Sequence, residues 1–130
     1  MHESSPSSRI SRAAAGCEAF CESGVLRIRL EGPAVGQREV PAMSGLMEEM
    51  LQAAGEGLRH VVFDLSGVSM MSSMGLGFCI ASRNEAVRRG ADCVLLGVGD
   101  ELLDLLRLMK LDPLFRICGT ESELARLTSP

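Results

Sequence analysis

The sequence predicts a small α/β domain built on a mixed, mainly parallel sheet of about four to five strands with helices packed against it. Short apolar runs of strand length alternate with segments whose apolar residues recur at helical spacing, an order typical of parallel sheets. The chain has 130 residues, the size of one domain, and 46% are hydrophobic, enough for a packed core. Because Trp and Tyr are absent, we expect an aliphatic and Met-rich core.

The first 15 residues are expected to form a disordered leader, because they are rich in Ser, Arg and Ala and show no apolar period. A single domain is then expected over residues 16–130. It begins with a hairpin at residues 20–30, because residues 25–30 alternate apolar side chains with arginines and follow a glycine-containing turn. That alternation buries one face of the hairpin and leaves the other in water.

After the hairpin we expect a loop at residues 34–40, followed by alternating helices and strands. The helices are indicated by apolar stripes, by Pro in a first turn, by Gly after a last turn or, for the last one, by a capping box; they are expected at residues 41–54, 73–89, 101–110 and 120–127. Two strands are short, nearly continuous apolar runs, which predicts burial on both faces; they are expected at residues 60–65 and 93–98. A short edge strand is expected at residues 115–118.

Charge and composition exclude several classes of function. The net charge is −4 and the one short basic cluster, residues 83–89, gives no footprint for a phosphate backbone, so no nucleic-acid partner is expected. No apolar run reaches the ~18 residues that cross a bilayer, and the N-terminus lacks the apolar core of a signal peptide. We therefore expect a cytoplasmic protein that does not insert into membranes.

Five scattered cysteines argue against a disulfide framework, since their number is odd. Cys17 and Cys21 have the spacing of half a metal site, but neither His2 nor His60 belongs to a matching second pair. We expect no bound metal and no cofactor. The other three cysteines lie in apolar stretches and are expected to be small core residues.

Residues 61–77, VVFDLSGVSMMSSMGLG, are the most informative stretch. A buried strand leads into a loop that ends in two serines and a Gly-x-Gly where a helix starts. Such a loop lies at the carboxyl end of a parallel strand, where α/β folds place their sites. Ser72 or Ser73 is expected to cap the helix, which contributes about 1 kcal/mol. A phosphate on Ser73 would lie at the positive end of the helix dipole, so the folded domain would tolerate it.

This stretch resembles the signature of the STAS domain family: a strand, LSGV, two apolar residues after a spacer, Asp, Ser, Ser or Thr, and Gly-Leu-Gly. The likeness extends over about residues 17–127 in element order and spacing. Gly90 matches the glycine that closes the helix after the signature, and residues 102–111 match the last core helix of the family. The resemblance implies the STAS fold and, in its anti-sigma factor antagonists, a binding module and not an enzyme.

The resemblance also implies a phosphorylation switch at Ser73, the position of the switch serine of these antagonists. A serine kinase that is itself an anti-sigma factor phosphorylates that serine, the phosphorylated antagonist releases the kinase, and a phosphatase resets the cycle. By the same likeness, the residues expected to meet the partner are Ser72, Ser73, Met74, Gly75 and Val35. The protein would then act in signal transduction and transcription regulation in a bacterial cell.

The chain departs from the family pattern in ways that bear on this switch. Ser72 replaces the signature Asp, Met74 stands where Ser or Thr is usual, Val35 replaces an acidic residue, and Lys110 replaces a glycine. The first three changes leave open whether a kinase still recognises the site. Met74 is either a partner contact or a side chain folded back onto its own core.

Other functions have less support or stay open. No enzyme is expected, because Ser73 lacks a G-x-S-x-G context and an acid/base pair, and residues 75–77 lack the third glycine of a dinucleotide site and the Lys of a P-loop. Other STAS domains serve as accessory subunits of transporters or as interaction modules that work without phosphorylation, and this alternative remains. A weak homodimer through the strand edge at residues 20–30 also remains, although Arg27 and Arg29 favour a hydrated face.

Overall fold

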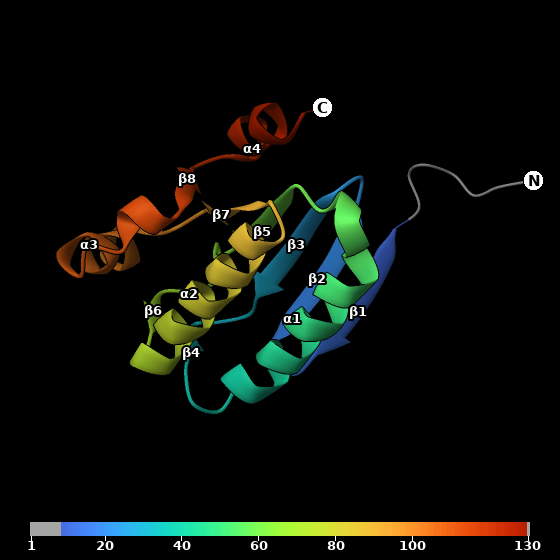
Figure 1. The fold of residues 1–130 in the computed structure, drawn as a ribbon. Helices are drawn as coiled ribbons and strands as arrows, with labels where there is room; N and C mark the ends of the chain where they lie inside the picture. Colours follow the sequence, from blue (N-terminus) through green and yellow to red (C-terminus); the bar gives the residue numbers. More distant parts are fainter. Residues whose placement is uncertain (1–8, 130) are drawn as a thin grey trace, which may run out of the picture.

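Six strands form the main sheet of the computed structural model, which describes residues 9–129 of the chain (Figure 1). Their order is β1-β2-β3-β5-β7-β8, with bounds Ile10–Ala14, Cys17–Glu22, Val25–Leu30, His60–Asp64, Asp92–Leu96 and Arg116–Cys118. The first two pairings are antiparallel and the last three are parallel. The sheet is mixed and mainly parallel, as the sequence predicts, with one strand more than expected.

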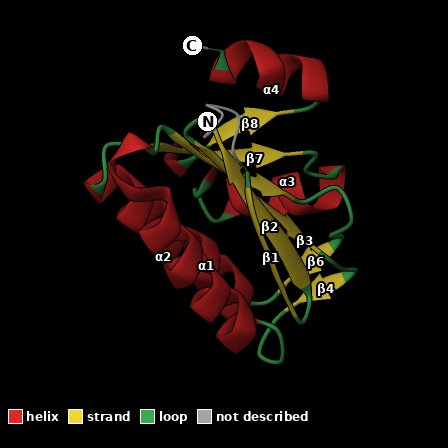
Figure 2. Ribbon diagram, turned by 90° about the vertical axis from the view of Figure 1, so that its right-hand side faces the viewer, coloured by secondary structure: helices red, strands yellow, loops and turns green. Residues whose placement is uncertain are grey.

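Four helices complete the fold: α1 (Val40–Ala54), α2 (Ser73–Arg88), α3 (Asp100–Leu108) and α4 (Glu121–Thr128). The first three connect successive parallel strands, and right-handed crossovers in one direction place them on the same face of the sheet. Phe63 of β5 packs in the core that these helices share, whereas its neighbour Val62 packs on the opposite face with Leu124 of α4. Figure 2 shows α1 and α2 side by side along one face, with α4 apart from them.

Strand β1 lies inside the segment that was expected to be a disordered leader. Ile10 pairs with Cys21 and Ala14 pairs with Cys17 of β2, and the Arg12 guanidinium donates to the Glu49 carboxylate of α1 at 3.3 Å. The prediction is therefore wrong for residues 10–14, because a hairpin with β2 and a contact with α1 stabilise a sequence with little apolar pattern of its own. Residues 1–8 of the expected leader lie outside the described part of the chain.

The strand edge expected for a homodimer is not free. Strand β2 is bonded to β1 and β3, and β3 is bonded to β2 and β5, so residues 20–30 have no unpaired edge to offer a second copy. In the main sheet it is β1 and β8 that lie at the two edges. The prediction fails because β1, which occupies that edge, was not anticipated.

A second, two-stranded sheet pairs β4 (Ala34–Val35) in parallel with β6 (Met70–Met71). Residues 34 and 35, which were expected in a loop, form this short strand instead. The pairing fixes the chain before α1 against the chain that leads into α2. It therefore positions the first turn of α2, which contains the two serines.

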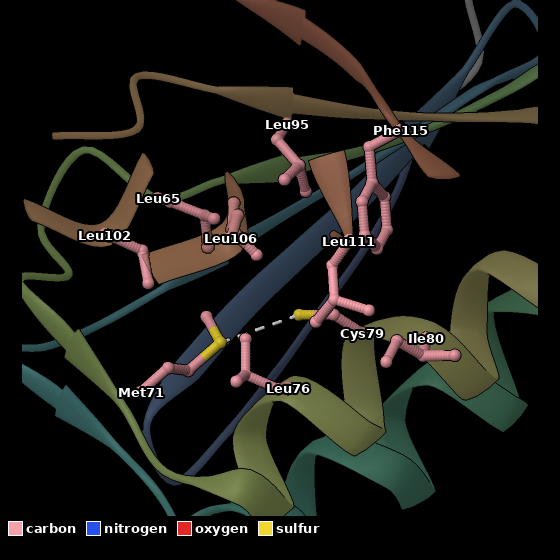
Figure 3. A pocket seen from close by; sticks show the side chains of 10 residues that line it. All are labelled: Leu65, Met71, Leu76, Cys79, Ile80, Leu95, Leu102, Leu106, Leu111 and Phe115. Carbon is pink, nitrogen blue, oxygen red and sulfur yellow. Dashed lines mark hydrogen bonds between the residues drawn. The ribbon is translucent and has the colours of Figure 1, made fainter. Parts of the chain in front are cut away.

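The core between α2, α3 and the sheet is almost filled. Figure 3 shows its side chains converging on a small apolar space; its lining residues are Leu65, Met71, Leu76, Cys79, Ile80, Leu95, Leu102, Leu106, Leu111 and Phe115. The remaining cavity of about 10 Å³ has room for one water at most, so this pocket accommodates no small-molecule ligand. The Cys79 thiol donates to the Met71 sulfur at 3.9 Å, and burial raises the pKa of Cys79 to about 12.

All five cysteines are free and buried. Within residues 9–129, no three His, Cys, Asp or Glu side chains gather in a way that could hold a metal ion. None of the helices in that range is long and apolar enough to cross a membrane.

Candidate functional site

Ser72 is the N-cap of α2, and its N–H, its carbonyl oxygen and its hydroxyl oxygen each take part in a hydrogen bond. Its backbone is extended, with φ −78° and ψ 174°, and its hydroxyl accepts a hydrogen bond from the Gly75 N–H at 3.3 Å. Its own N–H donates to the Val35 carbonyl at 2.9 Å, and its carbonyl accepts from the Leu76 N–H at 2.9 Å. Ser72 therefore satisfies helix N–H groups that would otherwise lack a partner.

Ser73 is the first residue of α2 and differs from Ser72 in its hydrogen bonding. Both side chains are exposed, but the Ser73 hydroxyl makes no hydrogen bond to any residue in the described range. The sequence left both serines as candidates for the cap. The structure assigns the cap to Ser72 and leaves the hydroxyl of Ser73 accessible at the positive end of the helix.

The three methionines around the serines differ in exposure. Met71 is 5% exposed and lies in the core, whereas Met70 is 67% exposed and Met74 is 46% exposed. Met74 therefore does not fold back onto the core. Ser73 lies between two exposed thioether side chains, a composition that suits an adaptable apolar contact.

Val35 and Gly75 were expected to contact a partner, and the structure corrects this for both. The Val35 side chain is 1% exposed, so it cannot meet another protein. Gly75 is also buried, and a Cβ added there would lie 2.7 Å from Met71 Cγ and 2.8 Å from the Val35 carbonyl oxygen. These two residues position the first turn of α2, because β4 passes so close to it that only glycine fits.

Asp64 is a site residue that the sequence analysis missed. It ends β5, is 5% exposed, and its Oδ1 accepts hydrogen bonds from the Ser66 N–H at 3.1 Å and the Ser66 hydroxyl at 2.6 Å. The Arg27 guanidinium donates to Asp64 at 2.9 Å and to Glu121 of α4 at 2.9 and 2.5 Å. Its position as the one acid in the apolar run HVVFDL was the available signal.

Burial and hydrogen bonds together set the protonation state of Asp64. Burial of Asp64 is the largest influence and opposes ionisation, but the hydrogen bonds from Ser66 and Arg27 together outweigh it and lower the pKa of the Asp64 carboxyl. Hydrogen bonds from Arg27 likewise lower the pKa of Glu121. Asp64 is therefore a carboxylate that shapes the loop leading to the serines, and its acceptor oxygens are already occupied.

Comparison with known proteins identifies what this arrangement is similar to. A family model described as the STAS domain matches residues 21–124. An anti-sigma factor antagonist from Mycobacterium paratuberculosis has a similar structure, with a TM-score of 0.71, 18% identity, and coverage of 98% of this chain and 100% of that one. The phosphorylated form of the Bacillus cell fate determinant SpoIIAA has a TM-score of 0.60 and 16% identity, and the match covers 92% and 99% of the two chains.

A sulfate transporter family protein from Wolinella succinogenes is also similar, with a TM-score of 0.60 and 18% identity. This match covers 72% of this chain and 75% of that chain. At these identities, the solved structures establish the fold and leave the partner undetermined.

Proposed function

The chain belongs to the STAS domain family, and from this premise we propose that it is a non-catalytic binding module of the anti-sigma factor antagonist type, switched by phosphorylation of Ser73. The observation that carries the proposal is the division of roles between the two serines. The Ser72 hydroxyl oxygen caps α2, and Ser73 presents an unbonded hydroxyl beside it. A modification of Ser73 therefore removes no hydrogen bond that the fold uses.

The physical basis of the switch is charge at a docking surface. A phosphate adds about −1.5 to −2 charges and three acceptor oxygens. The exposed position at a helix N-terminus lets the isolated domain keep its fold. A partner seated on Met70 and Met74 would have to desolvate that charge against an apolar surface, which is strongly unfavourable. Phosphorylation then releases the partner without a large conformational change.

The missing signature Asp does not disrupt the first turn of α2. Ser and Asp are about equally good N-caps, and Ser72 makes the bond to the Gly75 N–H that a capping side chain provides. The geometry that presents Ser73 is therefore retained with serine at position 72. The partner we propose is a serine kinase that is also an anti-sigma factor, with a phosphatase that resets the protein, all in the bacterial cytoplasm.

The test is capture of partners from lysates of the protein's own cells with the full chain as bait. Three baits are compared: the unmodified chain, the chain with phosphoserine incorporated at Ser73, and a control with phosphoserine at Ser44, which is exposed on α1. We expect a serine kinase to be retained by the unmodified and Ser44-modified baits and to be lost from the Ser73-modified bait. Equal retention by all three baits would contradict the switch.

A second candidate function follows from the similarity to the transporter family protein. In this reading the chain is an accessory subunit of a transporter or a docking module that works without phosphorylation. The same capture experiment separates the two, because a transporter component retained equally by all three baits supports the second candidate.

A further inference from the structure

Among the described residues, the segments that follow the carboxyl ends of β3, β5 and β7, near Ser73, contain a single Lys or Arg. These segments, which include the first turns of α2 and α3, span residues 31–39, 65–75 and 97–102. They carry four acidic residues: Glu31, Glu39, Asp100 and Glu101. Arg38 is the one Lys or Arg among them. A phosphate on Ser73 would enter a surface that is already acidic, with one cation to offset it.

The loop that carries Arg38 contacts the first turn of α2 directly. The Ser72 N–H donates to the Val35 carbonyl at 2.9 Å, and a Cβ added at Gly36 would lie 3.0 Å from the Ser72 hydroxyl oxygen. Arg38 follows Gly36 by two residues, which span at most about 7 Å even when extended. The turn bond from the Val40 N–H to the Gly36 carbonyl, 3.1 Å, shortens this separation.

Neighbouring side chains in this loop have separate roles. Glu39 is half-buried, and its carboxylate accepts a hydrogen bond from the Gly36 N–H at 2.8 Å, which closes the turn. Arg38 is exposed and has no ion pair or hydrogen bond with any residue from 9 to 129. The turn is therefore fixed by Glu39, and the Arg38 guanidinium is free to meet a new anion.

We propose that Arg38 is the intramolecular partner of a phosphate on Ser73, a step that rests on the proposed function. Guanidinium and phosphate form bidentate, charge-assisted hydrogen bonds, and the N-terminus of α2 supplies the favourable end of a helix dipole. Phosphorylation then ties the loop of residues 36–39 to the start of α2. The loop and the serine change together, so a partner that contacts both loses two contacts at once.

The test uses the full chain with phosphoserine placed at Ser73 during synthesis, so it does not depend on whether a cell phosphorylates that residue. The second pKa of the phosphate is measured by ³¹P NMR titration in the wild-type background, in R38Q and in the control R29Q. Arg29 is a suitable control because it is exposed on β3 and has no ion pair in the described range.

We expect the second pKa of the phosphate to be lower in the wild type than in R38Q by about 0.5, the scale of one exposed ion pair, because a nearby cation favours the dianion. The neighbouring acids are the same in both proteins, so they do not affect this difference, and R29Q should titrate like the wild type. Coincident titrations of wild type and R38Q would overturn the pairing, as would equal shifts in R38Q and R29Q. Loss of partner binding by unmodified R38Q, together with coincident titrations, would instead assign Arg38 to the partner interface.

Discussion

Gly75 and Gly77, two residues apart in α2, provide a sharp test of how the site is built. A Cβ added at Gly75 would overlap Met71 Cγ at 2.7 Å and the Val35 carbonyl oxygen at 2.8 Å. The second of these atoms belongs to the backbone of β4 and cannot move without disturbing its pairing with β6. A Cβ added at Gly77 would meet nothing within 4 Å.

The magnitudes follow from these distances. Alanine at Gly77 gains about 0.5–1 kcal/mol, because glycine inside a helix is less favourable than alanine by that amount. Alanine at Gly75 gains less from propensity in the first turn and loses about 1–3 kcal/mol to overpacking. We therefore expect G77A to be more stable than wild type, and G75A to be less stable than G77A by about 2–3 kcal/mol.

The measurement is urea and thermal unfolding followed by far-UV circular dichroism, since the chain has no Trp or Tyr for fluorescence. The melting temperatures of G75A and G77A should differ by about 6–12 °C for a domain of this size. G75A should also weaken partner binding, because it moves β4 and the Ser73 turn apart. A G75A variant as stable as wild type would refute the packing argument, as would stability changes of the same sign in both variants.

Three further predictions use the same unfolding assay. Lys110 has φ +59°, a left-handed conformation, so K110G should stabilise the chain by about 1 kcal/mol, and unchanged stability would show that no strain is present. S72A should lose about 1 kcal/mol through loss of the cap while S73A stays near wild type, and the reverse order would reassign the cap. Asp64 and Glu121 have lowered pKa values, so their stabilisation is complete above the unfolded values near 4 and is lost as the pH falls through the folded ones. Below about pH 4, E121Q should therefore lose less stability than wild type, and parallel pH curves would contradict this.

Much of the fold could be predicted because the local pattern and the tertiary environment agree. The apolar run at β5 is buried on both faces, and Gly90, with φ +81°, follows the end of α2 as expected of a helix stop. Strand β1 could not be predicted, because the segment ISRAA has no apolar period. Its stability comes from the hairpin with β2, which follows after two residues, and from the contact between Arg12 and Glu49, which lie 37 residues apart.

The site was predicted in position but not in detail. Ser72 and Ser73 are chemically equivalent N-cap candidates in the sequence, and only the backbone register decides which hydroxyl meets the Gly75 N–H. Val35 was assigned to the surface by its matching position, yet the pairing of β4 with β6 turns its side chain into the core. The contact of Gly36 with Ser72 depends on two loops meeting in space, which no local pattern reports.

The most direct test of the central claim is phosphosite mapping of Ser73 by tandem mass spectrometry, on protein recovered from its own cells grown with and without stress. The tryptic peptide of residues 60–83 contains both serines, so fragment ions between them must assign the phosphate. The account predicts a phosphate on Ser73 whose occupancy changes with the growth condition, and none on Ser72. An unmodified Ser73 under every condition would contradict the switch and leave the Met-flanked surface as a docking site that works without phosphorylation.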